Sequence, residues 1–242
     1  MTDPGQSARR ALGALQILVL AVIALNVALV GVQALLYRPL LAQPGSALYI
    51  AEPLALLAAY AFIVAIVANT ASPLRRQTLW QATALGVFVG ALEIVNLTLE
   101  TFSGASSLLT TAPFILGAFV LWGVAGGVWA WQTNSFRAGL LAAVWSAMLT
   151  MLIAVTYGFT LGYTSITRLE FLESHDPDFL ASHWADLHAF AIANQFDSGF
   201  SHLLGALIVG LLVGTLGSLV GVLGRRRGGY GRATVFGGAT PE

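Results

Sequence analysis

Of the 242 residues, 57% are hydrophobic and only 9% are charged, whereas a soluble domain has about 25% charged residues. Acidic and basic residues balance at 11 each, so net charge gives no indication of a nucleic-acid partner. The chain has no cysteine, which excludes disulfides, thiol catalysis and cysteine-ligated metals. It also has no lysine, because all 11 basic residues are arginine. A retinal Schiff base and lysine-dependent phosphate chemistry are therefore excluded.

Long apolar runs predict an all-α membrane protein with six spanning helices, because each run is near or above the ~20 residues needed to cross a bilayer. The spans are expected at about 11–37, 49–72, 79–102, 108–132, 138–164 and 199–224. The first is too long and too polar at its end for a cleaved signal peptide, so we expect a retained helix. The chain then divides into a tail at 1–10, a six-helix domain at 11–224, and a disordered Arg- and Gly-rich tail at 225–242.

Arginine placement predicts the orientation of the bundle. Nine arginines fall on one side of the predicted spans, namely Arg9, Arg10, Arg75, Arg76, Arg137, Arg225, Arg226, Arg227 and Arg232. Only Arg38 and Arg168 fall on the other side. By the positive-inside rule, both termini are expected in the cytoplasm.

The long outer loop, about 165–198, carries a helix-start signal. Asp176-Pro177-Asp178 combines a capping acid, a first-turn proline and a second acid near the positive end of the helix dipole. Apolar residues then recur at helical spacing, namely Leu180, Trp184, Leu187 and Ala191. We expect a short amphipathic helix that lies on the outer membrane face or caps the bundle.

The same loop holds weak candidates for metal ligands. His183, Asp186 and His188 are residue types that bind zinc or copper. His183 and His188 are five residues apart, so on one helix their side chains would diverge, whereas a ligand pair needs a spacing of three or four. The spacing therefore favours a solvated polar loop with no metal.

Two carboxylates lie inside the third predicted span. Glu93 and Glu100 are seven residues apart and share a helix face, with Asn96 beside them. A carboxylate at bilayer depth costs a few kcal/mol, so Glu93 should face the bundle interior or water. On a purely structural interpretation, Glu100 is an acid at the end of a helix, and Glu93 makes a hydrogen bond that holds a neighbouring helix. The functional alternative is a protonatable group or a ligand contact.

Further polar residues map to the outer half of the predicted bundle. The full set of candidate ligand- or proton-binding residues is Glu52, Glu93, Asn96, Glu100, Tyr157, Thr160, Asp197 and His202. Polar side chains also tie membrane helices together at ~0.6 kcal/mol each. This alternative explains hydroxyls and amides better than it explains carboxylates and a histidine. The set therefore predicts an outward-facing polar pocket.

The last span carries a continuous glycine face. The glycines are Gly210, Gly214, Gly217, Gly221 and Gly224, at steps of four, three, four and three. Glycine lets helix backbones approach closely, as in the GxxxG motif. The partner is either a span of this chain, with Gly123 and Gly127 as candidates, or another chain in a homo-oligomer or a larger membrane complex.

One short pattern is compatible with catalysis. Gly104-Ala105-Ser106-Ser107 precedes the fourth span, and His202 opens the sixth. This arrangement resembles the rhomboid intramembrane serine proteases, which also have six spans with both ends inside. The resemblance implies a hydrolase that needs Ser106 and His202. It covers only these residues: the family's G-x-S-G reads G-A-S-S here, and the second span has no His or Asn in its outer half.

The sequence has no phosphate loop and no cofactor fingerprint, so no cofactor is expected. The pocket favours a transporter, permease-type or solute- or lipid-binding membrane protein. The glycine face and the absence of energy-coupling motifs favour instead a non-catalytic subunit of a membrane complex. A membrane-embedded hydrolase or metal-dependent enzyme is the third hypothesis.

Overall fold

The computed structural model describes residues 4–70, 73–103 and 108–233, and throughout these ranges the secondary structure is helical. The helices are α1 (Pro4–Leu36), the 3-10 helix η1 (Arg38–Ala42), α2 (Ser46–Thr70), α3 (Pro73–Ser103), α4 (Leu108–Thr133), α5 (Phe136–Thr164), α6 (Ile166–Glu173), α7 (Pro177–Ser182) and α8 (Leu187–Ala233). Six of them are long and apolar enough to cross a membrane. The predicted all-helical fold with six apolar spans is therefore confirmed.

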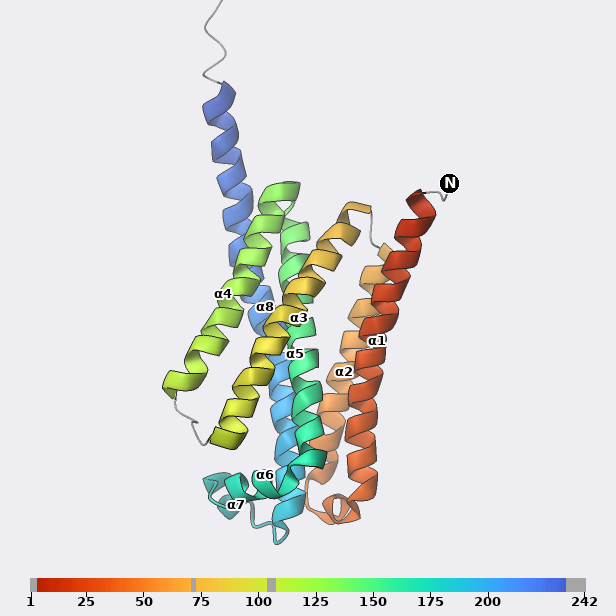
Figure 1. Cartoon of the computed structure of the whole chain (residues 1–242), viewed down its shortest axis with the longest axis vertical. Coiled ribbons are helices and arrows are strands. Elements are labelled where there is room, and N and C mark those ends of the chain that lie inside the picture. Colours follow the sequence, from red (N-terminus) through yellow and green to blue (C-terminus); the bar gives the residue numbers. More distant parts are fainter. Residues whose placement is uncertain (1–3, 71–72, 104–107, 234–242) are drawn as a thin grey trace, which may run out of the picture.

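The six long helices form a bundle with two distinct ends (Figure 1). In the view of Figure 1, α1 and α2 lie on one flank, α4 lies on the other, and α5 runs between them. η1, α6 and α7 gather at one end, which we call the loop end. α1 begins and α8 finishes at the opposite end, which we call the arginine end. The start of α1 and the end of α8 thus lie at the same end of the bundle, while the cytoplasmic location of the termini stays a prediction.

Helix α5 forms the centre of the bundle. In an apolar 18-residue stretch of this helix 78% of the residues are buried, whereas in the corresponding stretches of the other five spans 22–39% are buried. Small residues line its half near the arginine end, namely Ala138, Gly139, Ala142, Ala143, Ser146 and Ala147, and all are buried. Small side chains let neighbouring backbones approach closely, which is how helices associate where lipid removes the hydrophobic driving force.

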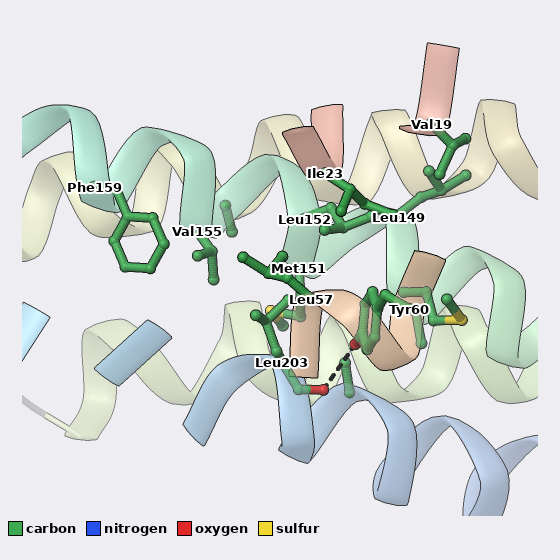
Figure 2. Packing of buried hydrophobic residues seen from close by; sticks show 14 of the residues in the cluster. Val19, Ile23, Leu57, Tyr60, Leu149, Met151, Leu152, Val155, Phe159 and Leu203 are labelled. Atoms are coloured by element: carbon green, nitrogen blue, oxygen red, sulfur yellow. Dashed lines mark hydrogen bonds between the residues drawn. The ribbon is translucent and has the colours of Figure 1, made fainter. Parts of the chain in front are cut away.

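Larger apolar side chains pack around the other half of α5. Figure 2 shows Val155 and Phe159 of α5 in the same buried cluster as Leu57 and Tyr60 of α2. The Tyr60 hydroxyl is fully buried and donates a 2.7 Å hydrogen bond to the carbonyl oxygen of Leu203 in α8. A buried hydroxyl needs such a partner, so this bond fixes α2 against α8.

Helix α8 is much longer than a bilayer requires. It has 47 residues, which at a rise of 1.5 Å per residue is about 70 Å, more than twice the ~30 Å hydrocarbon core. The predicted span 199–224 is its interior, and the helix continues to Ala233. Part of the segment expected as a tail is therefore helical, and residues 234–242 lie outside the described residues.

The outer loop differs from the single helix expected after Asp176. Asp176 does cap a helix, accepting a 2.7 Å hydrogen bond from the Asp178 N–H, but α7 ends at Ser182. His183 then adopts a left-handed backbone with φ 58°. The Asp186 carboxylate accepts a 3.0 Å bond from the Ala189 N–H and so begins α8. This second cap divides the apolar repeat between two helices.

The glycines of α8 lie against α4 and α5. A Cβ atom on Gly217 would lie 2.0 Å from the Gly123 carbonyl oxygen, and one on Gly221 would lie 2.1 Å from that of Gly127. On the α5 side, Cβ atoms on Gly210 and Gly214 would lie 2.9 and 2.7 Å from the Cβ atoms of Ala147 and Ala143. A Cβ atom on Gly224 would meet nothing within 4 Å. Association of this face with another chain stays a prediction.

Two substitutions in α8 separate close packing from helix propensity. Alanine is favoured over glycine inside a helix by ~1 kcal/mol, so Gly224→Ala should leave stability unchanged or raise it. Gly217→Ala should lower the free energy of unfolding by roughly 1–3 kcal/mol, because its methyl group meets the α4 backbone. The measurement is denaturation in detergent micelles followed by circular dichroism. Equal effects of the two changes would contradict the packing argument.

Candidate ligand-binding site

A cavity of about 250 Å³ lies between α3, α4 and α8 in the half of the bundle nearer the loop end; we call it the α4 cavity. Four predicted site residues line it, namely Glu93, Asn96, Glu100 and His202. Thr111 and Ser201 complete its polar lining. The remaining wall is apolar and includes Ile115, Phe119, Trp122, Met151 and Val209. The structure therefore brings together three polar residues of α3 and the histidine of α8.

A second cavity of about 500 Å³ adjoins the first; we call it the α6 cavity. It is lined by α3, α5, α6 and α8, and its polar residues are Glu100, Thr101, Glu173, Asn194, Gln195, Ser198 and His202. Leu97, Glu100 and His202 line both cavities. The two spaces are thus neighbours along α3 and α8, and Glu100 and His202 stand at their shared boundary.

Glu93 is the deepest carboxylate of the α4 cavity. It is only 6% exposed. Asn96, one helical turn away, donates a side-chain hydrogen bond to it, and His202 lies close enough to act on it electrostatically. Burial of a carboxylate is costly unless such groups compensate it. The Asn96 amide and the His202 ring are the groups that compensate the burial of Glu93.

The hydrogen bonds of His202 determine which ring nitrogen is free. Its Nδ1 lies 2.7 Å from the carbonyl oxygen of Ser198 in the preceding turn of α8. A carbonyl oxygen only accepts, so Nδ1 carries a proton and donates it to this bond. In the neutral ring Nε2 is then the nitrogen that accepts a hydrogen bond or a proton.

Glu100 connects α3 to α4 near the loop end. Its Oε1 accepts a 2.6 Å hydrogen bond from the Thr111 hydroxyl. Because Glu100 lines both cavities, this bond holds one carboxylate oxygen at their boundary.

Helix α6 covers the loop end of the bundle (Figure 1) and is tied down by three side chains. Arg168 donates from Nε to the Thr101 carbonyl oxygen of α3 at 2.7 Å. Glu170 pairs with the His188 Nδ1 of α8 at 2.5 Å. Glu173 accepts a 2.7 Å bond from the Asn194 amide of α8. Burial raises the pKa of the Glu173 carboxyl, and the Asn194 bond only partly offsets this effect.

A second polar cluster links α6 and α8 to the end of α1. The Tyr37 hydroxyl donates a 2.7 Å bond to Asp186 Oδ2, and its ring lies 4.1 Å from that of His188. Burial, together with Asp186, raises the pKa of Tyr37 to about 12. Burial also acts to raise the pKa of Asp186, but hydrogen bonds from Ala189, Tyr37 and His188 hold it below its usual value.

The other four candidates lie outside both cavities. The Tyr157 hydroxyl bonds to Thr98 of α3 at 2.7 Å, and Thr160 donates to the Thr156 carbonyl oxygen. Asp197 and Glu52 line neither cavity. Sequence reasoning missed Glu173, Asn194 and Gln195, because the acidic loop resembled a solvated segment. The apolar Leu169 and Leu172 beside Glu173 indicate that this helix has a buried face.

The three weak candidates for metal ligands do not form one group in the structure. His188 pairs with Glu170, Asp186 caps α8, and His183 is exposed at the end of α7. Within the described ranges, no three His, Cys, Asp or Glu side chains are grouped so that they could hold a metal ion. Ser106, the nucleophile that the rhomboid resemblance requires, lies outside the described residues.

No family model matches the chain, and neither a curated protein nor a solved structure shows significant similarity to it.

The raised pKa of Glu173 gives a pH-dependent stability. Because the pKa of Glu173 is raised in the folded state, the contribution of this residue to the free energy of unfolding is fully present below the unfolded-state pKa. It is lost as pH rises through the folded-state pKa. Glu173→Gln removes this loss and keeps an acceptor for Asn194. We expect the Tm to rise by about 2–4 °C near pH 7.5, the shift for about 1 kcal/mol in a chain of this size, and to stay unchanged near pH 4.

The matched control is Glu170→Gln on the same helix, which breaks the pair with His188 and should not raise the Tm near pH 7.5. Thermal unfolding in one detergent at both pH values checks both variants. A gain for Glu173→Gln of the same size at both pH values would refute the ionisation argument.

Proposed function

We propose that the protein binds a small amphiphilic molecule within the membrane, in the α4 and α6 cavities, as a transporter or as a solute- or lipid-binding membrane protein. The observation that carries the proposal is that Glu93 and His202, from two helices distant in sequence, line one cavity whose other wall is apolar. Ligand pockets typically combine an apolar lining with a few polar groups that orient the ligand.

The free-energy cost of placing carboxylates at bilayer depth favours a ligand site over a role in helix–helix contacts alone. A charged or titratable side chain at bilayer depth is expensive and in general faces a bundle interior or a water-filled cavity. Hydroxyls such as Thr83, which accepts a 2.9 Å bond from the Trp145 indole, already tie helices together. Helix association therefore does not need Glu93, whereas recognition of a polar group on a ligand does.

The size of the cavities agrees with such a ligand. The α6 cavity, at about 500 Å³, falls in the ~300–1,000 Å³ range of small-molecule sites. The smaller α4 cavity adjoins it at Glu100 and His202. A molecule with one polar group at this boundary and an apolar part along Ile115 and Phe119 would satisfy both kinds of wall.

Filling the α4 cavity tests the proposal. Gly205 lines the cavity, and a Cβ atom there would meet nothing within 4 Å, so Gly205→Leu fills space without a clash. The wild-type protein, gently extracted from its membrane, should carry a bound molecule as added mass in native mass spectrometry. Gly205→Leu should weaken binding about tenfold, which corresponds to about 1.4 kcal/mol, and should therefore reduce the occupied fraction.

Gly117→Leu is the matched control. A Cβ atom on Gly117 also meets nothing within 4 Å, but this residue lies outside both cavities, so bound mass should stay unchanged. Loss of the molecule in both variants, or in neither, would contradict a site in the α4 cavity. Uptake of the identified molecule into proteoliposomes would then distinguish transport from binding alone.

A groove on the other half of the bundle favours a second function, that of a subunit in a larger membrane complex. It lies between α4 and α8, has a volume of about 710 Å³, and is lined by apolar residues and by Gly123, Gly127, Gly217 and Gly221. Small residues along a groove allow another helix to approach closely. Stoichiometric partner chains in the same mass spectra would support this second function.

A further inference from the structure

The two cavities hold more acidic groups than basic ones. Glu100 and Glu173 line the α6 cavity, and Glu93 and Glu100 line the α4 cavity. Among the described residues that line the two cavities there is no arginine, and His202 is the one basic side chain. A space lined by three carboxyl groups and one histidine attracts positive charge and repels negative charge.

Arg168 of helix α6, which lines the α6 cavity through other residues, contacts groups other than the cavity carboxylates. Arg168 donates to the Thr101 carbonyl oxygen at 2.7 Å, and its guanidinium lies 5.2 Å from the centre of the Phe171 ring. Glu173, on the same helix, is bonded instead to the neutral amide of Asn194. The protein thus leaves the Glu173 carboxyl, which is only 9% exposed, without a cationic side chain as partner.

The rest of the lining suits an apolar body attached to a cationic group. The apolar part of the α6 cavity lining consists of Leu97, Ala154, Val155, Phe159, Leu161, Leu169 and Leu172. Asn194 and Gln195 supply amide oxygens, whose partial negative charge also favours a cationic group.

We propose that the paired cavities select an organic cation, that is, an ammonium group carrying apolar substituents. This inference rests on the proposed function, because it names the class of ligand for the same site. A hydrated inorganic ion would leave the apolar wall unused. An anionic amphiphile would face Glu93, Glu100 and Glu173 at close range, and like charges across a desolvated site give strong discrimination.

Three probes that share one phenyl ring test the charge of the ligand. They are benzyltrimethylammonium, benzyl alcohol and benzenesulfonate, titrated into the full chain in an uncharged maltoside detergent by isothermal calorimetry. The titrations are made near pH 8, because the raised pKa of Glu173 keeps more of that carboxyl protonated at lower pH. The cation should bind at least about tenfold more tightly than either other probe.

Variants then locate the binding. Glu173→Gln and Glu100→Gln each keep a hydrogen-bond acceptor and remove a charge, and each should weaken the cation about tenfold. Glu52→Gln makes the same chemical change on α2, outside both cavities, and should leave the affinity unchanged. An equal loss in all three variants would overturn the inference, because it would show only the effect of net charge.

The experiments distinguish a site that binds a ligand of another charge from the absence of any ligand site. If benzyl alcohol or benzenesulfonate binds as tightly as the cation and Gly205→Leu abolishes that binding, the site exists but does not select cations. If benzyltrimethylammonium does not bind at all, the assignment of a cationic ligand is wrong. A molecule that copurifies with the wild-type chain and is lost in Gly205→Leu would still support the proposed function in that case.

Discussion

The enclosure of α5 by the other helices is the constraint on which the rest of the structure depends. A spanning helix satisfies its own backbone, so it needs no partner for hydrogen bonding, yet 78% of the residues in an apolar 18-residue stretch of α5 are buried. Small residues toward the arginine end let α4 and α8 approach it, and larger ones toward the loop end keep α3 and α8 apart. The cavities lie where this spacing is wide, and the tight glycine contacts lie where it is narrow.

The all-helical fold with six spans was predictable because apolar length alone determines it. The outer loop was harder to predict, since Asp176 and Asp186 are both competent caps and the apolar repeat runs through both. Local signals do not say which cap ends one helix and begins the next. The left-handed backbone at His183 settles this only in the folded chain, where Asp186 also bonds to Tyr37 on a distant segment.

The candidate site was partly predictable from the sequence. A carboxylate in an apolar span identified Glu93, and shared depth identified Glu100, Asn96 and His202, all of which line the α4 cavity. Depth gives a residue's height in the bundle but not its direction around the helix axis. Tyr157 and Asp197 have suitable height and lie outside the cavities, whereas Glu173 reaches a cavity because α6 folds back over the bundle end. Such a return of the chain leaves only a weak signal in sequence spacing.

The unbroken length of α8 has a mechanical consequence. One rod of 47 residues carries Asn194 and His202 of the cavities, the glycines that contact α4, and Arg225, whose guanidinium donates to the carbonyl oxygens of Trp131 and Gln132 at 2.7 and 2.6 Å. A helix about 70 Å long that tilts by about 5° displaces its far end by about 6 Å. A rigid-body tilt of α8 would therefore move the cavity residues Asn194 and His202 together with Arg225 at the opposite end of the bundle.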